Sequence, residues 1–208
     1  MGRILNFFIG AACVLVLVGC STSTSKSKST LKQALQSKPK AGLELPDKVH
    51  FLQTDRRWSH HRLGGTNESL ESDGCLVTAV AMALVNLGFQ TNPGDLNQSL
   101  KDYGGFNSRG WLVWSGLERA TAGKAKTVFY NRKDIQDNKN DVRACLAAGY
   151  YPLVKFNLPS TQTHWVMVIK DTKQGFYIRD PMVDSRRPIP LSSRTKTIDA
   201  VRCIGVRA

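Results

Sequence analysis

Apolar residues gather into helix-length segments in the first half of the chain and into short strand-length runs in the second half. The expected helices cover residues 75–87, 93–100, 111–120 and 138–148, and the expected strands cover residues 126–130, 151–157, 164–170, 175–179 and 201–206. Because helices come first and two of the strands are joined by a short turn at 171–175, we predict an α+β fold with an antiparallel sheet.

Cap and turn residues set the expected helix boundaries. Ser72 or Asp73 is expected to cap the helix that begins at Cys75, because both side chains can accept a hydrogen bond from the first helical turn. Trp111 and Trp114 lie three positions apart on the third predicted helix. That spacing favours packing in the core over the lining of a peptide or glycan groove.

The beginning of the chain indicates export. Arg3 precedes an apolar run over residues 4–18, which is too short to span a membrane, and a Ser/Thr/Lys tract follows Cys20. This arrangement resembles a bacterial lipoprotein signal, which implies a signal peptide over residues 1–19 and lipid attachment to Cys20. An ordinary secretory signal or an uncleaved anchor is the alternative. Where a cell has two membranes, Ser21 after the cysteine favours the outer one.

Residues 20–47 are predicted to form a lipidated, flexible tether. The segment is rich in Ser, Thr, Lys and Gln, so it cannot bury enough apolar surface to fold. The segment contains five lysines and only two acidic residues, so it could be attracted to an anionic membrane or wall surface, or it could equally be a merely solvated linker. Residues 48–208 are long enough to form one domain with a real core.

The formal net charge of +13 does not indicate a nucleic-acid partner, because the basic residues are scattered and no nucleic-acid-binding motif is present. Attraction to anionic envelope polymers or lipids is a weak inference from the same charge. His60 and His61 lack the spacing of a zinc site, so neither a metal nor a cofactor is expected. We expect a monomer in the cell envelope.

Cysteine positions distinguish one thiol from the others. Cys13 would leave with the signal peptide and Cys20 would carry lipid, so three cysteines remain in the folded part. Cys145 on a predicted helix and Cys203 on the last predicted strand are either small core residues or the two halves of one disulfide. Cys75 is the cysteine expected to stay free.

Cys75 also lies where a nucleophilic thiol is favoured. The first turn of a helix offers unpaired N–H groups and a positive dipole end, which stabilise a thiolate and can receive an oxyanion. The carboxylate of Asp73 would act against ionisation. His164 begins a predicted strand and Asp180 ends the next one, so the hairpin would bring the two to one edge. Taken separately, His164 and Asp180 could each have a purely structural role. Trp165 follows His164 in the predicted strand, so its side chain would point to the opposite face and pack there.

Several short motifs follow one another in an order that one peptidase family shares. They are Phe51-Leu52-Gln53-Thr54-Asp55-Arg56-Arg57-Trp58, Gly74-Cys75 with Thr78 and Ala79, Pro93 with Leu96, Gly104-Gly105-Phe106, His164-Trp165-Val166 and Tyr177-Ile178-Arg179-Asp180-Pro181. Together they resemble the bacteriocin-processing-like cysteine peptidases, papain-fold proteins related to the domain that trims double-glycine leader peptides. The resemblance implies Cys75 as nucleophile, His164 as general base and acid, Asp180 as the group that orients the imidazole, and Gln53 as an oxyanion donor.

One departure from the family pattern keeps three functions open. Many members read Gly-Cys-Gly-Pro-Thr at the nucleophile, where this chain has Leu76 and Val77 after the cysteine. These side chains could fill the path of a substrate backbone. The first hypothesis is an extracytoplasmic cysteine peptidase with a Cys75-His164-Asp180 triad. The alternatives are a hydrolase of peptidoglycan stem peptides on the same fold and an inactive pseudopeptidase that binds a peptide.

Overall fold

The structure is a computed structural model that describes residues 42–130, 135–160 and 162–206 of the 208-residue chain. The predicted signal peptide, Cys20 and most of the predicted tether lie outside these residues. Within the described ranges, no helix has both the length and the apolar character needed to cross a membrane.

A six-stranded antiparallel sheet runs through the described part of the molecule. Its strands are β1 (Ala125–Tyr130), β2 (Tyr151–Asn157), β3 (Thr163–Thr172), β4 (Gly175–Arg179), β5 (Ile189–Pro190) and β6 (Ala200–Val206). Their order across the sheet is β1-β6-β2-β3-β4-β5. The mixture of helices with an antiparallel sheet confirms the predicted α+β class.

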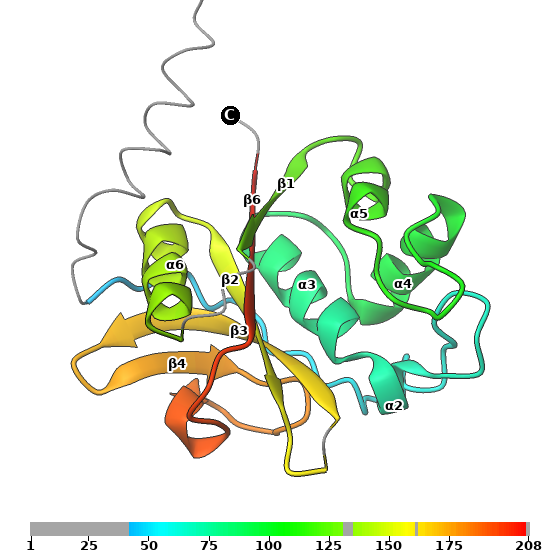
Figure 1. Cartoon of the computed structure of the whole chain (residues 1–208). Coiled ribbons are helices and arrows are strands. Elements are labelled where there is room, and N and C mark those ends of the chain that lie inside the picture. The colour runs from blue at the N-terminus through cyan, green and yellow to red at the C-terminus, as the bar shows by residue number, and fades with distance from the viewer. Residues whose placement is uncertain (1–41, 131–134, 161, 207–208) are drawn as a thin grey trace, which may run out of the picture.

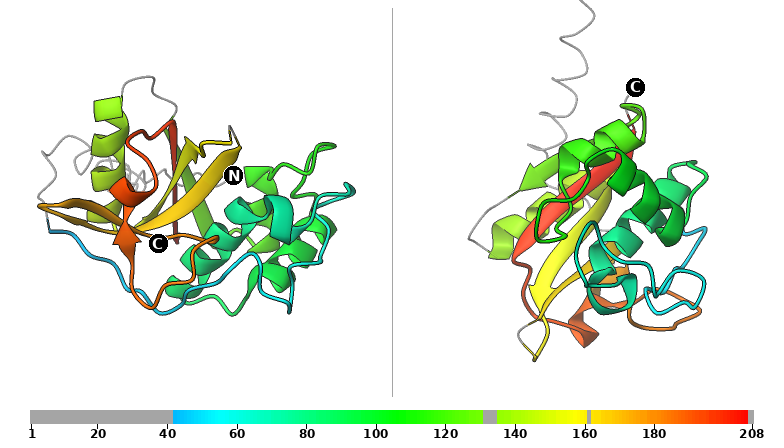
Figure 2. Two further views of the ribbon diagram at one scale, coloured as in Figure 1. Left: turned by 90° about the horizontal axis from the view of Figure 1, so that it is seen from below. Right: turned by 90° about the vertical axis from the view of Figure 1, so that its right-hand side faces the viewer.

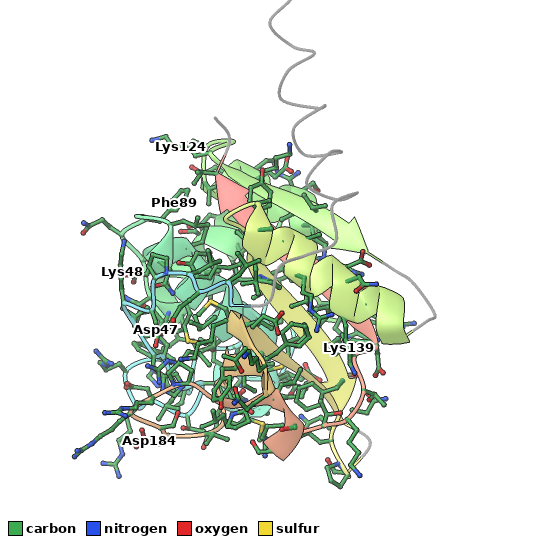
Figure 3. All side chains as sticks on the ribbon, turned by 90° about the vertical axis from the view of Figure 1, so that its left-hand side faces the viewer. Asp47, Lys48, Phe89, Lys124, Lys139 and Asp184 are labelled. Atoms are coloured by element: carbon green, nitrogen blue, oxygen red, sulfur yellow. A yellow bond between two sulfur atoms is a disulfide. The ribbon has the colours of Figure 1, made fainter. Side chains whose placement is uncertain are left out.

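Helices cover both faces of this sheet (Figure 1). One side carries α2 (Leu70–Asp73), α3 (Cys75–Asn86), α4 (Pro93–Asp102) and α5 (Trp114–Ala120), and the other carries α6 (Ile135–Ala147). A short 3₁₀ helix, η1 (Leu191–Ser193), precedes β6. The view from below shows the same separation (Figure 2), and the view from the α6 side places Lys139 on that outer helix (Figure 3).

Two hydrophobic cores lie on the two faces of the sheet. Alternate residues of a strand point to opposite faces, so Leu153 and Met167 pack with the α3 side, whereas Phe156 and Val166 pack with the α6 side. Helix α3 is apolar around nearly its whole circumference and is almost completely buried. This burial fixes the helix against β3 and so fixes the position of its first residue.

The predicted cap of α3 is wrong. Ser72 and Asp73 belong to α2, which Ser69 caps through its side-chain oxygen, and α3 begins after Gly74 without a side-chain cap. A Cβ atom at Gly74 would collide with the carbonyl of Leu70. The close contact at this glycine lets the chain end one helix and start the next within a single residue.

The third helix also begins later than predicted, at Trp114 rather than at residue 111. The side-chain oxygen of Asn107 accepts the N–H groups of Arg109 and Trp111, which holds this segment in a turn. The Trp111 side chain is 62% exposed. The expectation that Trp111 packs in the core is therefore wrong.

The folded part begins earlier than the predicted boundary at residue 48. The Leu45 N–H donates to the carbonyl of Ile169 on β3, at 3.0 Å. Asp47 forms an ion pair with the buried Arg179 of β4, at 2.7 Å. The last residues of the predicted tether are thus attached to the sheet, and Leu43 and Leu45 pack against its hydrophobic cores.

A disulfide joins Cys145 of α6 to Cys203 of β6. The sequence left open whether these residues are bonded or merely buried. Among the described residues, Cys75 is the free cysteine. The bond connects the outer helix to the sheet and closes a loop with a sequence separation of 58 residues.

Replacing both Cys145 and Cys203 by alanine is expected to lower the free energy of unfolding by about 2–4 kcal/mol, because the loop constraint on the unfolded chain is lost. Urea unfolding of the variant and of the wild type checks this. A reductant should shift the wild-type midpoint and leave the variant unchanged. Equal midpoints for the two proteins without reductant would contradict the prediction.

Candidate active site

Cys75 is the first residue of α3, and its backbone N–H is not used within the helix. In a continuous helix this N–H would donate to the carbonyl of Glu71, four residues earlier. The break at Gly74 separates the two, and the Glu71 carbonyl accepts the side-chain Nε2 of Gln53 instead, at 2.6 Å. The Cys75 N–H therefore has no backbone acceptor among the described residues. It can donate to an oxyanion.

The Cys75 thiol is buried, and its surroundings favour the neutral form. Burial raises the pKa of Cys75 to about 11, and the nearby carboxylates of Asp180 and Asp73 act in the same direction. The backbone amides of Trp165 and Leu76 act to lower the Cys75 pKa but are outweighed. The expectation that the start of α3 stabilises the thiolate of Cys75 is therefore wrong for the resting protein. The expectation that the carboxylate of Asp73 opposes ionisation of this thiol is confirmed.

The structure brings His164 and Asp180 together. His164 Nε2 lies 2.8 Å from Asp180 Oδ1, and both residues are buried. The β3–β4 hairpin creates this contact, because Met167 pairs with Arg179, the residue before Asp180. With Nε2 carrying the hydrogen toward the carboxylate, Nδ1 of the ring is the nitrogen with a lone pair.

The Asp180 carboxylate accepts two further hydrogen bonds. The Met182 N–H donates to Oδ1 at 2.8 Å, and Arg194 Nε donates to Oδ2 at 2.7 Å. Burial acts to raise the pKa of Asp180, but the hydrogen bond and charge of His164, the Met182 amide and the Arg194 charge together hold it below its ordinary value. The carboxylate is therefore ionised at neutral pH, and it is fixed from three directions.

Behind this carboxylate lies a second set of polar contacts. Nε2 of His50 faces the carbonyl of Asp180 at 3.0 Å, and its Nδ1 faces the carbonyl of Ser185 at 3.1 Å. Arg179 donates to the same Ser185 carbonyl and to the Asp47 carboxylate. These contacts hold the loop after β4 and thereby the backbone of Asp180. Sequence reasoning missed them, and it also missed Arg194.

Gln53 lies between the two halves of the site. Its backbone N–H donates to the carbonyl of Pro181, next to Asp180, at 2.9 Å, and its side chain donates to Glu71. The side chain is 2% exposed, and its Oε1 has no hydrogen-bond partner among the described residues. One amide hydrogen of Gln53 is thus used to hold the end of α2, and one remains for another acceptor.

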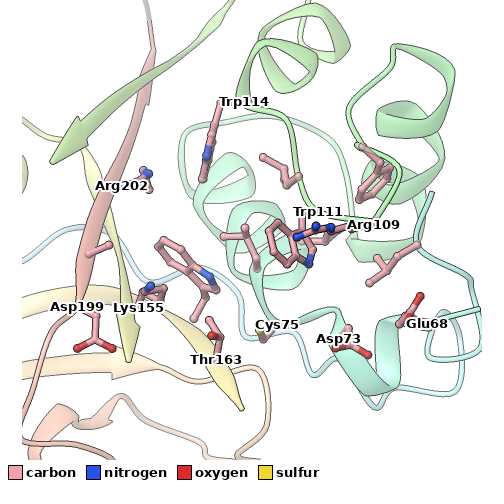
Figure 4. A pocket seen from close by; sticks show the side chains of 18 residues that line it. Glu68, Asp73, Cys75, Arg109, Trp111, Trp114, Lys155, Thr163, Asp199 and Arg202 are labelled. Atoms are coloured by element: carbon pink, nitrogen blue, oxygen red, sulfur yellow. The ribbon is translucent and has the colours of Figure 1, made fainter. Parts of the chain in front are cut away.

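A cleft of about 770 Å³ opens at Cys75 (Figure 4). Trp111, Trp114 and Trp165 contribute to its lining, as do Leu76 and Val77. The sequence favoured core packing over groove lining for Trp111 and Trp114. Both side chains line the cleft, and Trp114 also packs against the hydrophobic core, as predicted. Leu76 and Val77 form part of the wall beside the thiol, with Val77 buried and Leu76 half-buried.

No group of three or more His, Cys, Asp or Glu side chains in the described ranges could hold a metal ion. His60 and His61 contact each other edge to face, with ring centroids 4.7 Å apart. His60 is exposed and His61 is half-buried.

No family model matches the chain, and no curated protein matches it. Among solved structures, the fold is similar to that of a candidate C39-like peptidase from Bacillus anthracis. The similarity has a TM-score of 0.46 at 15% sequence identity and covers 79% of this chain and 98% of that chain.

The rate of Cys75 alkylation by iodoacetamide should be low at neutral pH and should still rise at pH 10, because the thiolate forms only near the raised pKa of about 11. Peptide mass spectrometry after timed quenching measures this rate at Cys75. Asp73→Asn should increase the rate at a given pH, because it removes a carboxylate that raises the Cys75 pKa. A plateau below pH 8.5 in the wild type would contradict this account.

Asp180→Asn should lower the free energy of unfolding by about 1–3 kcal/mol at pH 7, because His164 and Arg194 lose a buried charged acceptor. The folded-state pKa of Asp180 lies below its ordinary value, so this stabilisation is present above the unfolded pKa of about 3.9. It is lost as the pH falls through the folded pKa.

Urea unfolding of both proteins at pH 7 and at pH 3 tests this difference. The gap between wild type and Asp180→Asn should narrow at the lower pH. Asp184→Asn in the same loop is the control, because Asp184 is exposed, and it should change stability little at either pH. An unchanged gap between pH 7 and pH 3 would show that the charge of Asp180 is not what stabilises the fold.

Proposed function

We propose that this protein is a papain-like cysteine peptidase that hydrolyses peptide bonds through Cys75, His164 and Asp180. One observation carries the proposal. The buried carboxylate of Asp180 lies 2.8 Å from His164 Nε2 and also acts on the Cys75 thiol, whose pKa it raises. A cysteine nucleophile is activated when an imidazole that a carboxylate holds in one orientation takes up its proton.

In the proposed reaction, the Cys75 sulfur bonds to the carbonyl carbon of the substrate while its proton passes to Nδ1 of His164. The C–N bond then breaks, and the amine leaves with that proton. Water adds to the thioester and gives a proton to His164, and the thiol recovers this proton when the carboxylic acid leaves. Asp180 keeps the ring in place and stabilises the imidazolium that forms in each half of the cycle.

The proposed oxyanion donors are the backbone N–H of Cys75 and the remaining amide hydrogen of Gln53. The bond from Gln53 to the Glu71 carbonyl supports this assignment, because it occupies the acceptor that the Cys75 N–H would otherwise use. Gln53 would then serve the site twice, as a donor and as the residue that keeps the second donor available.

The proposed location is the cell envelope, with the chain attached through lipid on Cys20 after removal of residues 1–19. A disulfide between Cys145 and Cys203 supports an oxidising compartment outside the cytoplasm. The proposed peptidase domain begins by residue 42 and is joined to the lipid by a short basic segment. In a cell with two membranes, Ser21 favours the outer one.

Hydrolysis of a diverse peptide mixture, followed by mass spectrometry, tests the proposal. Cys75→Ala and His164→Ala should each reduce kcat/KM by at least about 1,000-fold, because the nucleophile or its base is lost. His60→Ala is the matched control, since His60 is exposed on a loop outside the cleft, and it should keep full activity. Cleavage that survives Cys75→Ala would overturn the proposal.

A second candidate is a pseudopeptidase that binds peptides without cleaving them, and the raised pKa of Cys75, about 11, favours it. It predicts that no peptide in the mixture and no purified peptidoglycan is cleaved by the wild type. It also predicts that peptides bind the wild type and Cys75→Ala with equal affinity. Release of fragments from peptidoglycan by the wild type but not by Cys75→Ala would exclude it and identify the stem peptides as a substrate.

A further inference from the structure

Charged side chains are unevenly distributed over the two walls of the cleft at Cys75 (Figure 4). The helical wall presents the carboxylates of Glu68 and Asp73 and the guanidinium of Arg109. The sheet wall presents Lys155 from β2 and Arg202 from β6. The sheet wall therefore carries two neighbouring cations, whereas the helical wall carries two carboxylates and one guanidinium.

Lys155 occupies the middle of the sheet wall. It pairs with Trp165 of β3 on one side and with Ala200 of β6 on the other, so its side chain shares the cleft face with the Trp165 indole. It is half-buried, and no carboxylate in the described part of the chain forms an ion pair with it. Asp199 lines the same wall, but it contacts Lys155 through its backbone N–H at 2.7 Å.

Arg202 adds a second positive charge to this face. It pairs with Leu153, two residues from Lys155, so the two cations are diagonal neighbours on the sheet. Its guanidinium lies 5.9 Å from the centre of the Trp165 ring. Burial lowers the pKa of Arg202, which shows that the charged form is partly desolvated. An anion bound at this face would interact favourably with the charges of Lys155 and Arg202.

We propose that Lys155 and Arg202 form a subsite for a carboxylate of the substrate, so that the preferred peptide carries an acidic group on the sheet side of the bond that Cys75 attacks. Trp165 lies against both cations and supplies an apolar surface for the carbon chain of that acidic residue. The carboxylate of Asp73, two residues before Cys75, disfavours the same group on the opposite side of the thiol. This inference rests on the proposed peptidase function and narrows its substrate class.

Binding to the full chain carrying Cys75→Ala measures the subsite without any need for turnover. The probes are matched peptide libraries that differ only in Glu against Gln at one position. The Glu peptides should bind about tenfold more tightly than the Gln peptides at low salt, and the preference should shrink as salt is added. Equal affinities for the two libraries at low salt would overturn the proposal.

Lys155→Met, added to Cys75→Ala, should remove most of this preference by weakening Glu peptides about tenfold and changing Gln peptides less than about twofold. Lys155→Arg should keep the preference, which separates loss of charge from loss of fold. Asp199→Asn should strengthen Glu binding, because it removes the one acidic group on this wall. The matched control is Lys139→Met on α6, on the far face of the sheet (Figure 3), which should leave the preference unchanged.

Turnover by the protein with Cys75 intact distinguishes the proposed peptidase function from the proposed carboxylate subsite. Preferential binding of Glu peptides without cleavage would support the subsite and would count against the peptidase function. Cleavage of Glu and Gln peptides at equal kcat/KM would support the peptidase function and overturn the subsite. A preference that persists unchanged in Lys155→Met would likewise overturn the assignment to this wall.

Discussion

The carboxylate of Asp180 is the group on which the geometry of the site depends. It follows the last residue of β4 and accepts hydrogen bonds from His164 on β3, from the Met182 amide and from Arg194, which follows η1. Three separate chain segments therefore meet at one buried charge. Burying a carboxylate is costly unless it is fully paired, so removal of any one donor would leave the others around an under-compensated charge. The imidazole is oriented as a consequence of this packing.

The second constraint is the break at Gly74. A continuous helix from Leu70 to Asn86 would use the Cys75 N–H internally and would leave no donor for a reacting carbonyl. The glycine ends α2, and Gln53 takes the Glu71 carbonyl that this helix would have used. The same residue donates its backbone N–H to Pro181, beside Asp180. Gln53 thus connects the thiol end of the site to the carboxylate end, although Cys75 begins α3 and Asp180 follows β4.

Short sequence patterns were sufficient to predict the helix that begins at Cys75, the β3–β4 hairpin and the order of the proposed site residues. The apolar run after Gly74, the hairpin turn before Gly175 and the order of Cys75, His164 and Asp180 are visible in the sequence, and the structure contains the corresponding elements and the contact between His164 and Asp180. The roles of Arg194 and His50 were not predictable, because their partners are 14 and 130 residues away in the chain and no local spacing marks them. The position of Trp111 was missed for a different reason, since the Asn107 turn delays the start of α5.

The neutral state of the resting thiol limits how the site could work. The increase in the pKa of Cys75 from 9.0 to about 11 corresponds to roughly 3 kcal/mol against ionisation. An imidazolium about 4 Å from a thiolate, at an effective dielectric constant of about 20, contributes roughly 4 kcal/mol in favour of the charged pair. Transfer of the proton to His164 can therefore offset the burial of Cys75, provided that bound substrate brings the two groups into reach. A site built in this way would keep its thiol unreactive toward small oxidants and alkylating agents until the cleft is filled.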